Sequence, residues 1–214
     1  MSLFCCFVKR RAWVELGLVL VTAVLHFVFQ TALHLDAPYI AAAVVFWTGY
    51  LVYRLRTPGQ ARAWGLRSDT FAASLKANGV LLLVAGAAMV RYGLSRGRGW
   101  PPPHSLYLLL ALYPVWGLIQ QFIICAIVCQ NLQTVFGSRI RAVAVGAALF
   151  GAVHLPNWTL CVLTATACAI WMSLFLRWPN LWVHGFSHGC LASLAYIYVL
   201  GEDPLAAVQQ MFNV

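Results

Sequence analysis

The sequence predicts an all-α fold: a polytopic membrane helix bundle of about seven transmembrane helices, in a single integral membrane domain of residues 1–214. Hydrophobic residues make up 62% of the chain and charged residues only 9%, whereas a soluble domain has about 25% charged residues. Apolar runs of membrane-spanning length recur along the chain. The basic residues, which give a net charge of +9, fall between these runs, and this distribution argues against nucleic-acid binding.

Seven apolar runs predict the individual helices. They cover residues 14–33, 38–55, 79–92, 105–136, 143–155, 158–176 and 180–200. The first run is too long for the apolar region of a cleavable signal peptide. The third run is shorter than a membrane-spanning helix needs to be, so its helix could instead begin earlier, near Phe71. The basic loop before it is consistent with an interfacial helix that starts at Ser68 or Asp69.

Prolines set most of the remaining boundaries. The segment GRGWPPP cannot continue a helix and therefore separates the third run from the fourth. The fourth run is the longest and contains Pro114. Pro156 ends the fifth run and Pro179 ends the sixth, while GEDP follows the seventh.

The basic residues also predict the orientation in the membrane. With the N-terminus in the cytoplasm, eleven of the fourteen basic residues lie on the inner side. They are Lys9, Arg10, Arg11, Arg54, Arg56, Arg62, Arg67, Lys76, Arg139, Arg141 and Arg177. Arg91, Arg96 and Arg98 remain on the outer side. The expected arrangement is N-terminus in and C-terminus out, in the cytoplasmic membrane if the cell is bacterial.

Polar side chains inside the apolar runs are the candidate functional residues, because such side chains are costly at membrane depth. Gln120 lies about 20 Å from the inner end of its span, His154 about 20 Å and His188 about 12 Å. These depths are comparable, so the three side chains and Gln121 are expected to line one cavity. Neighbouring residues of a helix point about 100° apart, so at most one of the two glutamines faces it squarely. The alternative for each residue is an interhelical hydrogen bond.

Together these motifs resemble the CAAX protease and bacteriocin-processing (CPBP, also called Abi) family of membrane proteases, over about residues 105–200. That family has Glu-Glu-x-x-x-Arg, then Phe-x-x-x-His, then His-x-x-x-Asn or Asp. LFGAVHLPN matches the second motif through Phe150 and His154, and LWVHGFSHGCLAS matches the third through His188. An alternative register makes His184-x-x-x-His188 the third motif. YPVWGLIQQFIIC places the glutamine pair where the family has its glutamates.

The resemblance implies an intramembrane endopeptidase, a hydrolase of prenylated or membrane-proximal peptides. It implies catalytic positions at Gln120, Gln121, His154 and His188, and substrate-binding positions at Phe150, Cys125 and His184. No metal or other cofactor is expected. A zinc site of three histidines is disfavoured because HxxxH is common by chance and no carboxylate completes the set.

The sequence keeps the motif histidines but departs from the family pattern at four other motif positions. Gln120 and Gln121 replace both glutamates, Cys125 stands at the arginine position, and Ala192 at the last Asn or Asp. A glutamine is neutral and only donates or accepts hydrogen bonds, so it does not act as the general base that hydrolysis needs. Hydrolysis is therefore expected to be altered, weakened or absent, which makes the chain a pseudoenzyme candidate.

Three functional hypotheses remain open from the sequence. The first is a family-type hydrolase that uses its histidines with support from the glutamines. The second is a non-catalytic relative that binds a lipid, a prenyl chain or a partner membrane protein as a scaffold or chaperone. The third and weaker one is a membrane enzyme acting on an isoprenoid lipid; the chain lacks the acidic clusters that hold a magnesium-bound diphosphate.

Overall fold

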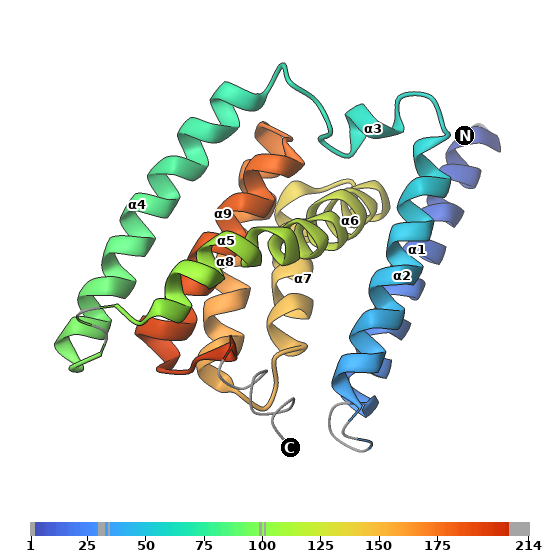
Figure 1. Ribbon diagram of the computed structural model, residues 1–214. Helices are drawn as coiled ribbons and strands as arrows, with labels where there is room; N and C mark the ends of the chain where they lie inside the picture. The colour runs from blue at the N-terminus through green and yellow to red at the C-terminus, as the bar shows by residue number, and fades with distance from the viewer. Residues whose placement is uncertain (1–2, 30–32, 34, 99, 101, 206–214) are drawn as a thin grey trace. The chain divides into compact units, whose positions relative to one another are not determined.

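The computed structural model describes residues 3–29, 33, 35–98, 100 and 102–205 (Figure 1). The chain forms two compact units, each made of two separate stretches of sequence. Unit 1 comprises residues 1–67 and 122–179, and unit 2 comprises residues 68–121 and 180–214.

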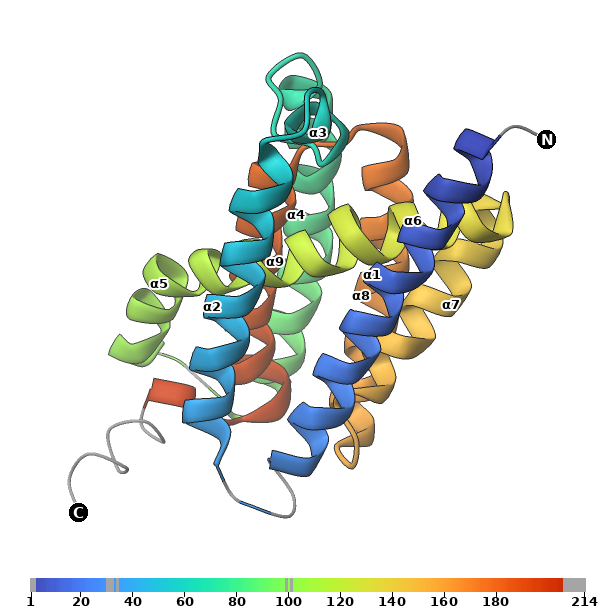
Figure 2. The ribbon, with the colours of Figure 1, turned by 90° about the vertical axis from the view of Figure 1, so that its right-hand side faces the viewer.

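Unit 1 is entirely helical over its described regular elements. Its elements are α1 (Leu3–Val28), α2 (Asp36–Leu55), α3 (Gln60–Ala63), the π-helical segment η2 (Phe122–Cys129), α6 (Gln130–Phe136), α7 (Arg139–Ala152) and α8 (Trp158–Arg177). Helices α1 and α2 form an antiparallel pair, visible in blue in Figure 2. Polar side chains begin the last two helices: Ser138 accepts a hydrogen bond from the Arg141 amide, and Asn157 accepts one from the Leu160 amide.

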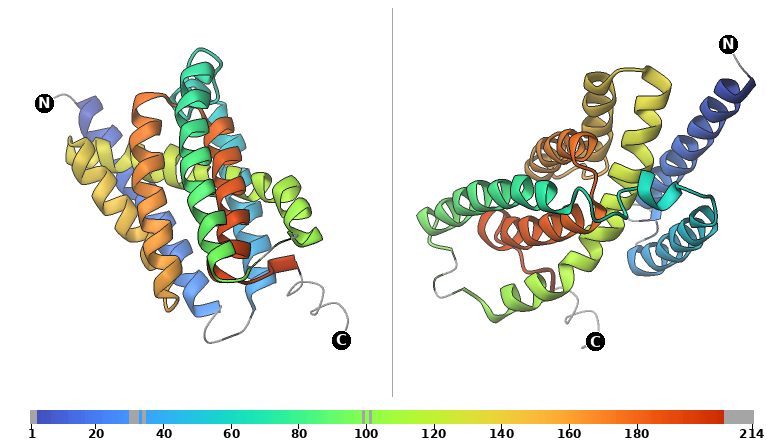
Figure 3. Two further views of the ribbon diagram at one scale, coloured as in Figure 1. Left: turned by 90° about the vertical axis from the view of Figure 1, so that its left-hand side faces the viewer. Right: turned by 90° about the horizontal axis from the view of Figure 1, so that it is seen from above.

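Unit 2 is built around the last helix of the chain. Its elements are α4 (Phe71–Ser95), α5 (His104–Gln121), α9 (Leu181–Leu194) and the π-helical segment η3 (Ala195–Leu200). Helix α9 packs against α5 and α4, and both views of Figure 3 show α4 and α9 side by side. Asn180 begins α9, where its side chain accepts a hydrogen bond from the Val183 amide.

The predicted all-α membrane bundle is confirmed. Five stretches of the described helices are long and apolar enough to cross a membrane: Phe7–Val28, Phe71–Ser95, His104–Phe136, Trp158–Arg177 and Leu181–Leu200. Helices form at the other two predicted places as well, as α2 and α7. Helix α7 has 14 residues, which is about 21 Å and less than the ~30 Å of a bilayer core.

Two helix starts differ from the predictions. Helix α1 begins at Leu3 rather than at residue 14, so the basic residues 9–11 lie within the helix and not before it. The interfacial helix expected from Ser68 or Asp69 was a wrong prediction, since residues 71–95 form the single helix α4. The residue before this helix is Thr70, and its side chain makes no capping hydrogen bond. The alternative start near Phe71 is confirmed.

Glycines bring α5 and α9 into close contact. A Cβ atom added at Gly117 would lie 2.7 Å from the Gly189 nitrogen and would also meet the Gly185 carbonyl oxygen. One added at Gly185 would lie 2.7 Å from the Leu118 Cα. The clashing atoms belong to backbone, which cannot move aside cheaply, so the two helices require small residues at this crossing.

We therefore predict that Gly117→Ala destabilises the protein by about 1–3 kcal/mol, the usual cost of overpacking. The measurement is thermal or denaturant unfolding of the full chain in detergent. Gly17→Ala on α1 is the matched control, because a Cβ there meets nothing within 4 Å. An unchanged stability of Gly117→Ala would contradict the close crossing.

Candidate functional site

The sequence-predicted residues Gln121 and His188 meet in unit 2. The last residue of α5 is Gln121, whose side chain is fully buried, and His188 lies on α9 and is 5% exposed. The Gln121 Nε2 atom lies 3.1 Å from the His188 Nδ1 atom. The glycine crossing lies one turn before Gln121 on α5 and on both sides of His188 on α9, so it holds the two helices close together beside this contact.

The direction of this hydrogen bond fixes the tautomer of His188. An amide nitrogen only donates, so the Gln121 Nε2 group is the donor and the His188 Nδ1 atom is the acceptor. In the neutral ring the proton then resides on Nε2. His188 therefore presents an N–H donor at its outer nitrogen rather than a lone pair.

His184 lies one turn before His188 and carries its proton on the opposite nitrogen. Its Nδ1 atom is 2.9 Å from the Asn180 carbonyl oxygen, which can only accept, so Nδ1 donates. The Ser74 hydroxyl on α4 lies 3.4 Å from the same nitrogen, and Asn78 donates to the Ser74 hydroxyl oxygen at 3.4 Å. His184, Ser74, Asn78 and Asn180 are all at most 2% exposed. His184 thus belongs to a buried polar network that joins α4 to α9.

His154 follows α7 in unit 1. Its Nδ1 atom lies 2.8 Å from the Phe150 carbonyl oxygen and 3.3 Å from the Thr164 hydroxyl of α8. Because the carbonyl only accepts, Nδ1 carries the proton and Nε2 of the neutral ring holds the lone pair. The Phe150 ring meets the imidazole edge-on, with centroids 5.0 Å apart. Phe150 therefore orients His154 through both its backbone and its ring.

The remaining predicted residues have distinct surroundings. Gln120 is half-buried on α5, and Cys125 is fully buried within η2. The helix widens to π geometry directly after Gln121, over Phe122–Cys129, and π-helical turns are frequent at functional sites. The shared cavity of Gln120, Gln121, His154 and His188 stays a prediction. An open hollow of about 570 Å³ lies elsewhere, along α4 at Ala87, Ala88, Arg91, Tyr92 and Ser95.

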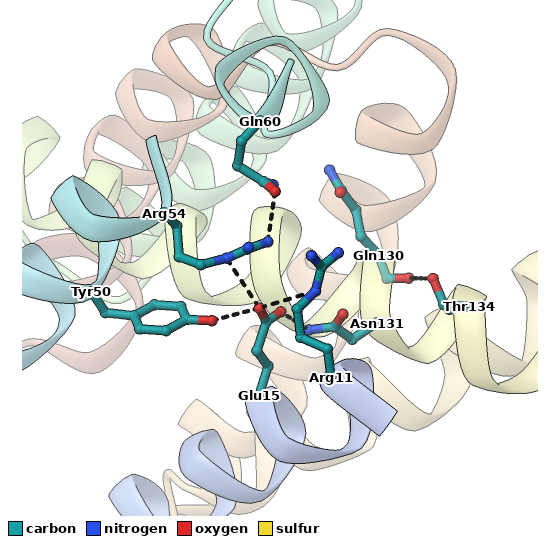
Figure 4. A network of polar contacts seen from close by, with 8 residues as sticks. All are labelled: Arg11, Glu15, Tyr50, Arg54, Gln60, Gln130, Asn131 and Thr134. Carbon is teal, nitrogen blue, oxygen red and sulfur yellow. Dashed lines mark hydrogen bonds and ion pairs between the residues drawn. The ribbon is translucent and has the colours of Figure 1, made fainter. Parts of the chain in front are cut away.

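Sequence reasoning missed a buried charged cluster in unit 1 (Figure 4). Glu15 of α1 is 3% exposed and lies 3.4 Å from Arg54 Nε and 3.9 Å from Arg11 Nε. The Tyr50 hydroxyl donates to Glu15 Oε1 at 2.5 Å, and the Asn131 amide donates to Oε2 at 2.6 Å. One carboxylate thus joins α1, α2 and α6. The available signal was a lone acidic residue within an apolar run.

The cluster extends from Arg54 to the start of the π-helical segment. Arg54 donates to the Gln60 side chain at 2.6 Å, and its guanidinium lies 5.6 Å from the centroid of the Trp64 ring. Trp64 is 2% exposed and meets the Phe122 ring edge-on, with centroids 5.0 Å apart. Phe122 follows Gln121 in the chain, so these contacts anchor the residue next to the candidate site.

No group of three or more His, Cys, Asp or Glu side chains that could hold a metal ion gathers within the part of the chain that the structure describes. The geometry offers instead one imidazole with a donor outward, His188, and one with an acceptor outward, His154. Hydrogen bonding and proton transfer by neutral groups are the chemistry available to these residues.

Comparison with known proteins finds a family model that matches part of the chain. The family model described as type II CAAX prenyl endopeptidase Rce1-like matches residues 102–194. Over these residues the chain is similar to that family, and the match supports the resemblance to the CPBP family. The Rce1-like region runs from before α5 to the last residue of α9, so it contains all three motifs. No curated protein and no solved structure matches the chain significantly. The chain is therefore an integral membrane protein that resembles a CAAX-type intramembrane protease.

We predict that the His188 imidazole is protonated at Nε2 and that Gln121→Glu moves this proton to Nδ1, because a carboxylate at position 121 can only accept from the ring. The measurement is the ¹⁵N chemical shifts of the His188 ring at neutral pH. Gln133→Glu on α6 is the control and should leave His188 unchanged. Protonation of the wild-type ring at Nδ1 would contradict the assigned bond direction.

Glu15→Gln should destabilise the protein by about 3–5 kcal/mol, because it leaves the buried Arg54 without a carboxylate. Unfolding of the full chain in detergent measures the loss. Glu202→Gln is the control, since that side chain is exposed. If the Glu15→Gln/Arg54→Met double variant regains stability, the loss is due to the unpaired charge of Arg54. An unchanged stability of Glu15→Gln would contradict the prediction.

Proposed function

We propose that this chain is a divergent CAAX-protease-like membrane protein whose peptide hydrolysis is weakened or lost, and which binds prenylated or membrane-proximal peptides. The observation that carries the proposal is the hydrogen bond that Gln121 Nε2 donates to His188 Nδ1 at 3.1 Å. In a glutamate–histidine pair the ring Nδ1 donates to the carboxylate, and Nε2 is left to accept a proton. The amide reverses this arrangement and removes His188 from the role of base.

His154 keeps the opposite arrangement and supports residual catalysis. Its Nδ1 proton is held by the Phe150 carbonyl at 2.8 Å, which leaves the Nε2 lone pair to accept a proton from water. A single histidine without a carboxylate is a weaker catalyst than a paired set. A general base raises the rate by about 10²–10⁴-fold only when it is correctly placed and in the correct protonation state. The expected residual activity is therefore a slow hydrolysis that requires His154.

The second candidate is a relative without catalysis that holds a lipid, a prenyl chain or a partner membrane protein as a scaffold or chaperone. It is favoured by the full burial of Gln121 and His184, because Gln121 bonds His188 of α9 and His184 contacts Ser74 of α4, so both side chains hold helices together. Phe150, Cys125 and His184 are then binding or supporting residues. An enzyme acting on an isoprenoid lipid remains a weaker candidate.

The orientation proposed for this function places the N-terminus in the cytoplasm. Arg98, one of the basic residues left on the outer side, donates to the backbone carbonyls of Tyr198 and Val199 near the end of η3. A cation that bonds the carbonyls at a helix end has a structural role. The presence of Arg98 on the outer side is therefore weaker evidence against this orientation. If the cell is bacterial, the membrane is the cytoplasmic one.

Peptidase turnover on prenylated and membrane-proximal peptides in liposomes tests the proposal. We expect slow turnover by the wild type, none by His154→Ala, and an increase of about 10²-fold in Gln120→Glu/Gln121→Glu, which restores a carboxylate beside His188. Gln130→Glu/Gln133→Glu is the control for adding two carboxylates to the same stretch of helix.

Binding of a non-cleavable prenylated peptide, measured in parallel, separates the two candidates. Binding without wild-type turnover supports the scaffold, and turnover that needs His154 supports the slow hydrolase. Fast wild-type turnover that the glutamate pair does not raise would overturn the proposed weakening. Absence of both binding and turnover would overturn both candidates.

A further inference from the structure

One end of unit 1 gathers cations from several elements. Glu15 contacts Tyr50 and Arg54, and the Tyr39 hydroxyl bonds the Thr22 carbonyl, so α1 and α2 run antiparallel. The first turns of α1 therefore lie beside the last turns of α2, next to α3, and the start of α7 lies toward the same end (Figures 1 and 2). The exposed cations on these elements are Lys9, Arg10, Arg56, Arg62, Arg139 and Arg141.

The acidic residues of unit 1 do not balance this charge. Its sequence contains only Glu15 and Asp36, and Asp36 begins α2 at the opposite end. The Glu15 carboxylate is already shared by Arg54 at 3.4 Å and Arg11 at 3.9 Å. One negative charge thus serves two arginines within the buried cluster, and the exposed cations above it add to the excess.

Aromatic side chains mark the membrane boundary at the same level. Trp13 is 58% exposed and lies two residues after Arg11, and Tyr53 is 65% exposed and precedes Arg54. Exposed tryptophan and tyrosine prefer the interface between hydrocarbon and water. Beyond them α1 and α2 expose apolar side chains, such as Leu20 and Val45. Along α1 and α2 the cations therefore lie beyond the aromatic residues, which is the order expected where a helix meets lipid headgroups.

We propose that this basic end of unit 1, formed by Lys9, Arg10, Arg56, Arg139 and Arg141, binds the phosphate groups of anionic phospholipids. Charge complementarity selects an anion, and the adjoining exposed aromatic and apolar side chains select one that carries acyl chains. A lysine or arginine near an anionic surface attracts it across about a Debye length. Nucleic acid would satisfy the charge but not the apolar surface directly below it.

The test uses the full chain in nanodiscs with equal amounts of phosphatidylglycerol and phosphatidylcholine, and native mass spectrometry to identify the retained lipids. We expect the wild type to retain phosphatidylglycerol preferentially. Arg10→Gln/Arg56→Gln should lower that preference by roughly fivefold for each cation removed. Arg91→Gln/Arg96→Gln on α4 is the matched control, since it removes two exposed arginines from unit 2. Unfolding temperatures check that each variant stays folded.

Each outcome decides the proposal. Loss of the preference in Arg10→Gln/Arg56→Gln alone supports it, as does a preference that falls with rising salt. Equal retention of the two lipids by the wild type overturns it, and so does an equal loss in the α4 control. Displacement of phosphatidylglycerol by low concentrations of inorganic phosphate would assign the site to free phosphate and overturn the lipid as its ligand. None of these outcomes depends on peptide hydrolysis.

Discussion

Hydrocarbon offers no water to a polar group, so a polar side chain within a membrane bundle is costly unless it finds a partner inside the protein. This constraint accounts for the internal contacts of both units. In unit 1 it gathers four side chains around the Glu15 carboxylate, and in unit 2 it pairs Gln121 with His188. The pairing also has a direction. Because an amide nitrogen only donates, the choice of glutamine over glutamate sets the proton position on the histidine it touches.

The same constraint explains how much the sequence predicted. Only helices and closed barrels satisfy their backbone in lipid, so hydropathy alone predicted the helical bundle, and rarity of polar residues identified Gln121 and His188. The π-helical segment after Gln121 has no pattern in FIICAIVC that distinguishes it from α-helix. The Glu15 cluster depends on side chains up to 116 residues apart, which one sequence cannot pair. Arg54 looked like an ordinary loop-flanking cation for the same reason.

Backbone packing and site chemistry are linked at the crossing of α5 and α9. Gly117 precedes Gln121 by four residues, and Gly185 and Gly189 lie on either side of His188, so the crossing lies next to the polar pair. Side chains at the crossing would separate the helices and lengthen the 3.1 Å contact beside it. The small residues therefore affect the hydrogen bond between Gln121 and His188 by setting the distance between the two helices. A bulkier residue at Gly117 would loosen the same hydrogen bond whose donor determines the His188 tautomer.

Three of the departures from the resembled family pattern remove charge. Gln120 and Gln121 in place of two glutamates remove two negative charges, and Cys125 in place of the arginine removes one positive charge. A buried charge without a partner costs several kcal/mol, roughly 3–5 when one partner of a pair is lost. Loss of the acidic and basic groups together avoids that penalty and leaves neutral side chains. Such surroundings accept an apolar prenyl chain at lower cost than a charged transition state, which is why weakened hydrolysis and retained ligand binding belong to one proposal.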